Sequence, residues 1–450
     1  MKTSLMKLLG DAKRVGFFGL GKSNLSLLSM LDGSVSVTLR SDREISPCSI
    51  PDGIRVDKIL TGELALSHIF EDVLVLSPSV NRKRPEICEA IRRGVKVTSD
   101  AELFFSVARA PVIAVTGSSG KSTVATLTHS LIESGGLPGG GCVLSGNVGI
   151  PMLESAADDC RVYVCELSSF MLSYLKSSVS RCAITNITPN HLDFHESFEE
   201  YRDTKLSLVG LSREAVICAD DKILGERFEN KPIFGVFSTE KTLKELVGSF
   251  RAEHYATVED GYLCHNGEML IHTGELKRRE DHNLKNMLCA ILLSCGYTTR
   301  AAVRAVLSNF VGLAHRCEKV YEKDGIKYIN SSIDTSPERT ASTLSSLGEN
   351  VIVLLGGRGK GLSYTPLIPV LKKHSRLVIC FGEEGERLFS LLSPHIRCIL
   401  CNKLCDAVSR AQEEVMRGDT VLLSPACTSY DEFKSFEHRG DEFRRLCHIG

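Results

Sequence analysis

The sequence TGSSGKST, residues 116–123, has the residue types of a loop that binds nucleotide phosphates. It follows the apolar run VIAV and precedes a helical pattern, which is the context that such a loop requires. Backbone N–H groups wrap the phosphates, the lysine reaches the β- and γ-phosphate oxygens, and the next hydroxyl binds Mg²⁺. We therefore predict an ATP site in which Lys121 is catalytic and the following residues bind the nucleotide: Gly117, Ser118, Ser119, Gly120, Lys121, Ser122 and Thr123. One departure is Val115, which stands where the general pattern has its first glycine.

Two further polar residues follow predicted strands beside this loop. Glu166 ends the strand pattern RVYVCE, and His191 lies just beyond the next strand pattern, CAITNIT. The carboxyl ends of strands line the ligand crevice of an open α/β sheet, where a carboxylate and an imidazole can hold Mg²⁺. Taken singly, a strand-end Glu is often a helix cap and a lone His is usually a surface or core residue. Their shared position beside the loop favours a metal site.

Two other motifs have weaker signals. The sequence GLGKSN, residues 19–24, half-matches a dinucleotide fingerprint, but Asn24 occupies the place of the third glycine. It is compatible with a nicotinamide or flavin site, with the diphosphate of another nucleotide, or with a turn that simply needs glycine. Lys205, in YRDTKLSL, has by itself the pattern of a solvated helical lysine.

Composition excludes several functions. The net charge of −1 gives no general attraction to nucleic acid or anionic lipid, and no apolar run approaches the roughly 18 residues of a membrane span. The N-terminus lacks the pattern of a secretory signal. Seventeen scattered cysteines indicate reduced thiols in a cytoplasmic protein, and the cluster at residues 398–405 has no second ligand pair at a zinc-site spacing.

Strand and helix patterns alternate along the chain, which predicts parallel sheets of the doubly wound α/β class. The 450 residues allow about two to four domains, and we place boundaries that give units of 1–108, 109–311 and 312–450. Turn signals at residues 259–261 and 266–267 predict a short antiparallel region near 255–273. The sequence EKVYEKDGIKYINSS predicts a hairpin at the start of the third unit.

Several sequence blocks, in order along essentially the whole chain, resemble the motif series of the Mur ligase family. The blocks are VTGSSGKST, CELSSFML, TNITPNHLDFH, EEYRDTKL, HNLKNMLCA, GLAHRCEKV, LLGGRGKG and LLSPACTSYDEFKSFEHRGDEF. The loop and metal-site blocks are typical of the whole family. The last two blocks resemble in particular those of the members that add D-glutamate.

The resemblance implies three domains: a Rossmann-like N-terminal domain for a UDP-sugar, a central P-loop ATPase, and a mobile Rossmann-like C-terminal domain that closes over both. It implies ATP-dependent amide synthesis between UDP-N-acetylmuramoyl-L-alanine and D-glutamate, in cytoplasmic peptidoglycan assembly. The γ-phosphate would pass to the L-alanine carboxylate, and the D-glutamate amine would attack the acyl phosphate through a tetrahedral intermediate. We expect a monomer whose partners are small molecules, with neither nucleic acid nor a membrane among them.

The resemblance also implies roles for individual residues. Ser122 and Glu166 would hold the Mg²⁺ bound to ATP, and His191 would help to hold a second Mg²⁺. In this family the lysine that matches Lys205 is carbamylated and bridges toward the metals. Residues expected to contact the nucleotide are Asn283 and Asn286 at the adenine, and His315 and Arg316 at the ribose and phosphates.

The substrate residues follow from the same resemblance. Asn147 matches a contact to the acceptor substrate. The expected D-glutamate pocket comprises Thr335, Lys360, Ser429, Tyr430 and Phe436. Lys360 can pair with the side-chain carboxylate of the incoming amino acid. The residues at positions that touch the UDP end are Ser23, Arg43 and Ser79.

Three positions depart from the family pattern. Ser331 and Ile333 replace an aspartate and a lysine on the nucleotide side, and Asp334 and Arg339 are the candidates to compensate. Ser79 replaces a glycine that is usual in the N-terminal block.

Three alternatives remain open at this point. A sister ligase could add L-alanine, a diamino acid, a dipeptide, or glutamate on folate, although the Asp-Asn-Pro-Arg signature of the diamino-acid adder is absent. A nicotinamide-dependent oxidoreductase would use GLGKSN but would leave the phosphate loop unexplained. A nucleotide-binding regulatory protein without ligase activity would not need Lys205.

Overall fold

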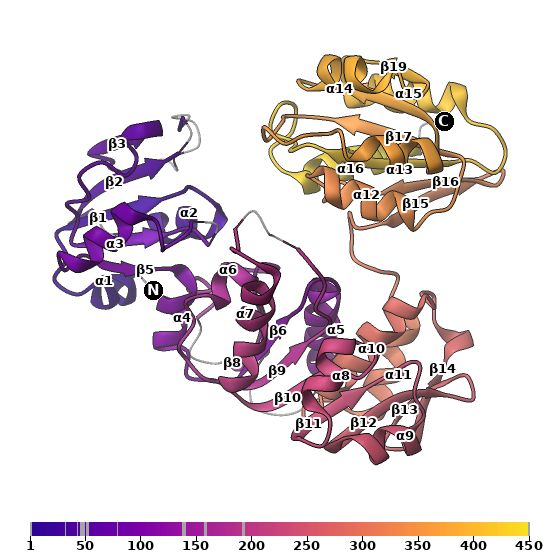
Figure 1. Ribbon diagram of the computed structural model, residues 1–450, viewed down its shortest axis with the longest axis horizontal. Helices are drawn as coiled ribbons and strands as arrows, with labels where there is room; N and C mark the ends of the chain where they lie inside the picture. Colours follow the sequence, from indigo (N-terminus) through magenta and orange to yellow (C-terminus); the bar gives the residue numbers. More distant parts are fainter. Residues whose placement is uncertain are drawn as a thin grey trace. The chain divides into compact units, whose positions relative to one another are not determined.

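The computed structural model describes residues 2–31, 33–42, 44–45, 50, 54–78, 80–136, 141–156, 160–190 and 194–448. By their internal contacts, these residues form two compact units, Met1–Phe310 and Val311–Gly450. The described residues form three sheets, which follow one another along the colour gradient of Figure 1 from indigo to yellow, and parallel strand pairs dominate all three. The predicted α/β class with parallel sheets in three regions is therefore confirmed. Among the described residues, every helix is too short or too polar to cross a lipid bilayer.

The first sheet has the strand order β3-β2-β1-β4-β5, and its strands are parallel. Its elements are α1 (Lys2–Leu9), β1 (Arg14–Phe18), α2 (Lys22–Ser29), β2 (Ser36–Ser41), β3 (Lys58–Thr61), β4 (Val73–Leu76), α3 (Pro85–Arg92), β5 (Lys96–Thr98) and α4 (Asp100–Val107). The strand order reverses between β1 and β4, which is the kind of switch point where doubly wound sheets bind ligands.

The GLGKSN turn joins β1 to α2 at this switch point. Asn24, which replaces the third glycine of the fingerprint, is fully buried. Its amide Nδ2 donates to the carbonyls of Gly19, at 2.7 Å, and Phe18, at 3.3 Å. The side chain therefore closes the turn from inside.

The central sheet has the strand order β14-β13-β12-β11-β10-β9-β6-β8-β7. The strands are β6 (Val112–Thr116), β7 (Gly141–Gly146), β8 (Cys160–Glu166), β9 (Val179–Ile184), β10 (Ser212–Cys218), β11 (Pro232–Phe237), β12 (Arg251–Glu259), β13 (Tyr262–His265) and β14 (Glu268–His272). The strands from β7 to β12 pair in parallel. The pairs β12–β13 and β13–β14 are antiparallel, which confirms the predicted antiparallel region.

Helices cover both faces of the central sheet (Figure 1). They are α5 (Lys121–Gly135), α6 (Ser169–Leu172), α7 (Phe198–Gly210), α8 (Lys222–Phe228), α9 (Leu243–Ser249), α10 (Asp281–Leu293) and α11 (Arg300–Asn309). Alternate residues of β6 divide between the two cores. Ile113 and Val115 pack with α5 and α10, whereas Val112 and Ala114 pack with α4, α6 and α7. Burial on both faces explains the continuous apolar run of β6.

The second unit contains a six-stranded sheet in its described residues, in the order β15-β16-β20-β17-β18-β19. Its strands are β15 (Glu318–Lys323), β16 (Ile326–Asn330), β17 (Val351–Gly356), β18 (Ser375–Phe381), β19 (Cys398–Leu400) and β20 (Thr420–Ala426), and its helices are α12 (Pro337–Ser345), α13 (Leu367–His374), α14 (Gly385–Leu392), α15 (Leu404–Glu414) and α16 (Phe436–Cys447). Strands β15 and β16 are antiparallel, so the predicted hairpin is confirmed. Helices α12 to α14 pack on one face, and α15 and α16 pack on the other.

Candidate active site

The phosphate-binding loop connects the carboxyl end of β6 to the first turn of α5. Gly120 caps the helix in the left-handed region, at φ +79°, so the loop turns sharply before Lys121. The Lys121 ammonium lies across the loop and donates to the carbonyls of Gly117, at 2.9 Å, and Ser118, at 3.0 Å. Ser122 and Thr123 follow in the first turn and are mostly buried. The N–H groups of this turn and the lysine together form an anion-binding site.

The segment after β9 holds the loop in place. Thr185 donates through Oγ1 to the Ser119 carbonyl at 2.6 Å, and the Asn186 side chain accepts from the Ser119 N–H at 3.0 Å. The Ser118 hydroxyl donates to the Thr188 carbonyl and accepts from the Thr188 N–H, both at 2.9 Å. These contacts fix the loop on the end of the neighbouring strand. The sequence analysis missed these residues, although the polar run TNIT directly after a strand was a signal for them.

Glu166 is the last residue of β8, next to β6, as predicted, and it is 1% exposed. Its Oε1 accepts from Asn147 Nδ2 at 3.0 Å, so the structure brings together the predicted metal ligand and the predicted acceptor contact. Its Oε2 is buried without a hydrogen-bond partner among the described residues. A buried, unpaired carboxylate oxygen is costly. A bound divalent cation would compensate that cost, so the donor set fits Mg²⁺.

Lys205 is buried at the same loop and is only 1% exposed. Its Nζ donates to the Gly117 carbonyl at 2.8 Å, the same carbonyl that Lys121 contacts. Burial, and then the nearby Lys121 cation, lower the pKa of Lys205 to about 6, although Glu166 opposes this shift. The amine is therefore mostly neutral at neutral pH. Lys205 is not the solvated helical lysine that its local sequence pattern alone suggested.

Tyr201, one turn before Lys205 on α7, is a residue that the sequence analysis missed. Its hydroxyl lies 2.9 Å from Ser118 Oγ, and its ring centroid is 4.7 Å from Lys205 Nζ. The buried residues of α7 are Tyr201, Lys205 and Leu208, at helical spacing. That stripe was the available sequence signal that Lys205 faces the core.

Helix α10 contributes the two predicted adenine contacts. Asn286 is mostly buried, and its Oδ1 lies so close to Gly120 that a Cβ on this glycine would overlap it. Asn283 lies one turn earlier, and its Nδ2 donates to Glu280 at 2.9 Å. Both asparagines therefore lie on the same side of the sheet as the loop.

Of the other site residues predicted for the first unit, the structure describes only Ser23. Ser23 lies in the first turn of α2, and its hydroxyl bonds to the buried Asp100. Three predicted site residues fall outside the described residues: Arg43, Ser79 and His191.

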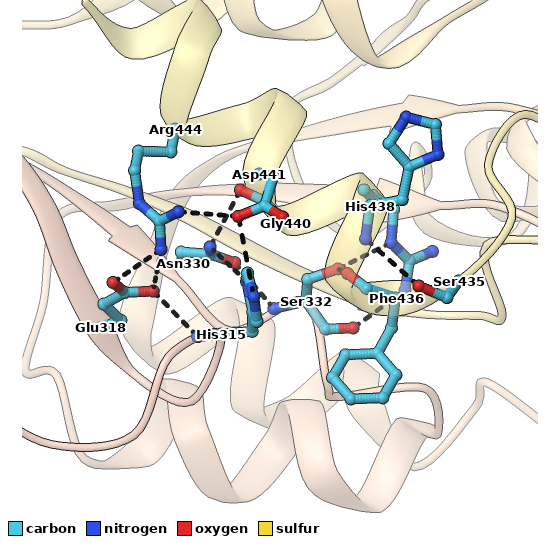
Figure 2. Close-up of polar contacts among 11 residues, drawn as sticks. His315, Glu318, Asn330, Ser332, Ser435, Phe436, His438, Gly440, Asp441 and Arg444 are labelled. Atoms are coloured by element: carbon cyan, nitrogen blue, oxygen red, sulfur yellow. Dashed lines mark hydrogen bonds and ion pairs between the residues drawn. The ribbon is translucent and has the colours of Figure 1, made fainter.

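In the second unit, His315 is held in a defined orientation (Figure 2). Its backbone has a φ of +59°, and its N–H donates to Glu318 at 2.8 Å. Asn330 donates through Nδ2 to His315 Nδ1 at 3.1 Å, which leaves the proton on Nε2. That nitrogen lies 3.8 Å from Asp441. Arg316 follows directly, and its N–H donates to the Leu313 carbonyl.

Two residues of the predicted D-glutamate pocket are in contact. Lys360 Nζ donates to Thr335 Oγ1 at 2.9 Å, which orients the ammonium group. Ser429 is buried, Tyr430 is 62% exposed, and Phe436 begins α16. A hydrogen bond from Ser332 to the Phe436 carbonyl, at 2.8 Å, anchors the start of this helix.

Arg439, which the sequence analysis also missed, ties this region together. It is fully buried and donates to Ser332 Oγ and to the carbonyls of Thr428 and Ser332, each at 2.9 Å. Burial lowers the pKa of Arg439 to about 10, so it stays charged at neutral pH. It therefore joins the segment before Ser429 to the loop after β16.

Two of the three positions that depart from the family pattern, Ser331 and Ile333, form hydrogen bonds within the second unit. Ser331 Oγ accepts from the Cys317 N–H at 3.1 Å, and the Ile333 N–H donates to the His315 carbonyl at 3.2 Å. Asp334 is buried and accepts from Ser424 at 2.9 Å. Arg339 is exposed and donates to the Ile333 carbonyl at 3.3 Å.

The α/β fold and the phosphate-binding loop at residues 116–123 define a P-loop nucleotide-binding protein. Residues 115–294 match the Mur ligase middle domain, and residues 315–427 match the Mur ligase, glutamate ligase domain. The chain is 33% identical over 441 residues to the UDP-N-acetylmuramoylalanine–D-glutamate ligase of Haemophilus influenzae (strain PittEE), covering 96% of this chain and 98% of the relative. It is 34% identical over 446 residues to the protein of that name in Pasteurella multocida (strain Pm70), covering 97% and 98%. The chain belongs to the Mur ligase family.

A solved structure with a similar fold is the UDP-N-acetylmuramate-alanine ligase of Thermotoga maritima. It aligns with a TM-score of 0.58 at 17% sequence identity, over 97% of this chain and 99% of that chain. A pseudomurein peptide ligase type C from Methanothermus fervidus aligns with a TM-score of 0.52 at 17% identity, over 97% and 99%. At these identities the likeness shows the shared fold alone.

Gly120→Ala is expected to weaken ATP binding by at least about tenfold, because its Cβ would overlap Asn286 and strain a φ of +79°. The matched control is Gly136→Ala at the other end of α5. Its φ is +60°, but its Cβ would meet nothing within 4 Å. Calorimetric titration with ATP, together with thermal unfolding, compares the two variants. Equal ATP affinities in both would contradict the prediction.

Proposed function

We propose that this protein is an ATP-dependent ligase that joins D-glutamate to the L-alanine carboxylate of UDP-N-acetylmuramoyl-L-alanine, in cytoplasmic synthesis of peptidoglycan precursors. Relatives that match nearly the whole chain are named for this reaction. The observation that carries the proposal is the cluster of Lys121, Lys205 and Glu166 at one phosphate-binding loop. A protein that only binds nucleotides does not need a buried neutral lysine beside a buried carboxylate.

The chemistry requires groups of this kind. A carboxylate is a poor electrophile, and transfer of the γ-phosphoryl group to its oxygen supplies a leaving group. The D-glutamate amine then attacks the carbonyl carbon, the C–O bond to phosphate breaks, and the amine loses a proton. Lys121 would stabilise the negative charge that moves during phosphoryl transfer. The dry surroundings of Lys205 and Glu166 strengthen such interactions.

Two Mg²⁺ ions fit the proposed reaction. When bound, they would neutralise the phosphate oxygens and the acceptor carboxylate. Ser122 and Glu166 would hold the ion on ATP, and the unpaired Oε2 of Glu166 supports that assignment. His191 and a carbamate on Lys205 would hold the second. Carbamylation would turn a group that is costly to protonate in this place into an anion that metals favour.

The remaining predicted residues take the substrate roles. Asn283, Asn286, His315 and Arg316 would bind the nucleotide, and Asn147 would contact the acceptor. Ser23, Arg43 and Ser79 would bind the UDP end. The D-glutamate pocket would comprise Thr335, Lys360, Ser429, Tyr430 and Phe436. We propose that the protein acts as a monomer, with the domain boundaries 1–108, 109–311 and 312–450.

Phosphate release from ATP and Mg²⁺, measured with UDP-N-acetylmuramoyl-L-alanine and a panel of amino acids, tests the proposed function. Release is expected only when both the acceptor and D-glutamate are present, and not with L-glutamate. Release with another amino acid would overturn the substrate assignment and favour a sister ligase. Absence of release with every pair would overturn the ligase assignment.

Lys360→Met is expected to raise the KM for D-glutamate by about 10- to 100-fold and to leave the KM for ATP unchanged. The reason is the loss of a charge-assisted hydrogen bond, worth roughly 1.5–3 kcal/mol, to the side-chain carboxylate. Lys373→Met, at an exposed position of α13, is the control and should alter neither constant. A KM for D-glutamate that Lys360→Met leaves unchanged would remove this residue from the pocket.

A further inference from the structure

Two histidines and a cysteine meet on the central sheet, away from the phosphate-binding loop. His254 lies in β12 and His265 in β13, and Ala256 is the residue directly opposite His265. Since side chains alternate along a strand, His254 lies on the same face as Ala256 and is a diagonal neighbour of His265. Cys295 follows α10, which packs against β12. Strand β12, strand β13 and the segment after α10 therefore bring one side chain each to the same place.

The potential ligand atoms of these side chains are close together. His254 Nδ1 lies 3.0 Å from His265 Nε2, and Cys295 Sγ lies 3.7 Å from the same Nε2. All three atoms lie within 4.8 Å of one another. Tetrahedral zinc, with its ordinary bond lengths, separates two nitrogens by about 3.3 Å and a nitrogen from a sulfur by about 3.6 Å. The two spacings to His265 Nε2 differ from these values by a few tenths of an ångström, and His254 Nδ1 and Cys295 Sγ lie within 4.8 Å of each other.

The surroundings are compatible with a cation. All three residues are partly buried, so solvent can reach part of the cluster. Arg181 is the nearby cation, and it is paired with Glu214 at 2.6 Å while donating to the Cys295 carbonyl at 2.8 Å. The carboxylates of Glu253 and Glu268 also act on the two histidines. The negative charges of these two carboxylates oppose the repulsion that the positive charge of Arg181 would exert on a bound cation.

Metal binding at this cluster would release the proton of the cysteine thiol. Burial raises the pKa of the Cys295 thiol to about 11, so a metal would have to displace its proton. Cys295 is not in a disulfide.

A second group of similar composition shows the contrast. His129, Glu133 and Cys142 also lie close together. There, however, the His129 ring bonds to the Cys142 carbonyl and Glu133 accepts from the Cys142 N–H. These side chains clip α5 to β7 through the backbone. In the first group the two histidine nitrogens instead bond to each other, and Cys295 Sγ donates to the Ile291 carbonyl at 3.4 Å, contacts that a bound metal would replace.

We propose that His254, His265 and Cys295 bind one transition-metal ion of the Zn²⁺ class, with water as the fourth ligand. Such an ion would cross-link the β12–β13 hairpin to the C-terminal end of α10. Strand β12 is four strands from β6 in the sheet, a separation on the order of 20 Å, so this centre is separate from the proposed Mg²⁺ sites. It does not depend on the proposed function.

Titration of reduced, metal-free protein with Co²⁺ tests this proposal, since four-coordinate Co²⁺ bound to a thiolate gives intense visible bands and a near-ultraviolet charge-transfer band. We expect both at one equivalent, and Zn²⁺ in excess should abolish them. Cys295→Ser should lose the charge-transfer band, and His265→Ala should lose the visible bands as well. Zn²⁺ should raise the Tm of the parent protein and of neither variant.

Cys401→Ser, in the cysteine-rich segment 398–405, is the matched control and should retain both bands. Loss of the bands in this control would assign the metal to that segment and overturn the proposal. The proposal also fails if the visible and charge-transfer bands both persist in Cys295→Ser and in His265→Ala. It fails as well if Co²⁺ produces neither band in the parent protein. Circular dichroism establishes that each variant is folded, and Cys295→Ser is conservative enough to keep the test valid if His265→Ala unfolds.

Discussion

Lys205→Ala is expected to lower ATP-dependent phosphate release by at least about 100-fold, and bicarbonate or a short carboxylate should restore part of it. The lysine is 1% exposed and donates to the Gly117 carbonyl at 2.8 Å, so it lies directly at the phosphate-binding loop. Because its pKa is about 6, most of the amine is neutral at pH 7.5. A neutral amine adds CO₂ to give a carbamate and releases one proton.

The rescue separates a catalytic carbamate from a merely structural lysine. A small carboxylate that diffuses into the space left by the side chain would supply the missing anion, whereas a packing defect would not respond to it. Lys231→Ala, at an exposed position, is the control and should keep full activity. Full activity of Lys205→Ala without any additive would contradict the carbamate role.

The pH dependence of carbamylation follows from the same pKa. Protein stripped of CO₂ is expected to regain activity with bicarbonate at a nearly constant rate above pH 7, once the actual CO₂ concentration is taken into account. Below pH 6 the rate should fall about tenfold per pH unit, because only the neutral amine reacts and the pKa of Lys205 is about 6. Rate constants measured across pH 5–8 check this. A tenfold rise per unit that continued to pH 8 would indicate an ordinary lysine.

In CO₂-free buffer, the free energy of unfolding should also depend on pH because Lys205 titrates at different pH values in the folded and unfolded chains. The unfolded chain holds the Lys205 proton up to a pKa of about 10.4, whereas the folded chain releases it near pH 6. Between these values the unfolded state binds more protons, so stability rises with pH. Lys205→Met removes the titrating group and should flatten that slope.

Local signals explain why much of the fold could be predicted. The turns at Asp260–Gly261 and Asn266–Gly267 both require positive φ, which Asp, Asn and Gly adopt readily. These four residues were therefore enough to predict the antiparallel β12–β14 region. The phosphate-binding loop was predictable for a similar reason, because it combines glycine, lysine and hydroxyl residues between a strand and a helix. Glu166 needed one further inference, that parallel strands end at the same edge.

Burial and long-range pairing could not be predicted in the same way. Charged neighbours surround Lys205 in the sequence, and only the packing of α7 against the loop places it in the core. Arg439 is a comparable case, since its acceptor Ser332 lies 107 residues away in the sequence. The contact between His254, His265 and Cys295 depends on strand register and on where α10 ends. Such contacts are properties of the tertiary structure, which residue spacing does not report.

Glu166→Gln is expected to lower Mg²⁺-dependent phosphate release by at least about 100-fold while leaving the protein as stable as before, or more stable. The substitution keeps the shape of the side chain and an oxygen that can accept from Asn147, whose Nδ2 lies 3.0 Å from Oε1. It replaces the unpaired Oε2, which is buried in a side chain that is 1% exposed. Removing the charge of a carboxylate whose Oε2 is buried and unpaired relieves a desolvation cost in the metal-free protein.

Magnesium titration distinguishes a metal ligand from a structural carboxylate. In the parent protein, Mg²⁺ with ATP should raise the Tm, since a ligand that binds only the folded state stabilises it. The rise should be much smaller in Glu166→Gln. Glu154→Gln is the matched control, because Glu154 is an exposed carboxylate that accepts from Ser26, and it should behave like the parent. A Glu166→Gln protein with lower stability but an unchanged Mg²⁺ dependence would mean that Glu166 supports the β8 end and Asn147 without holding the ion.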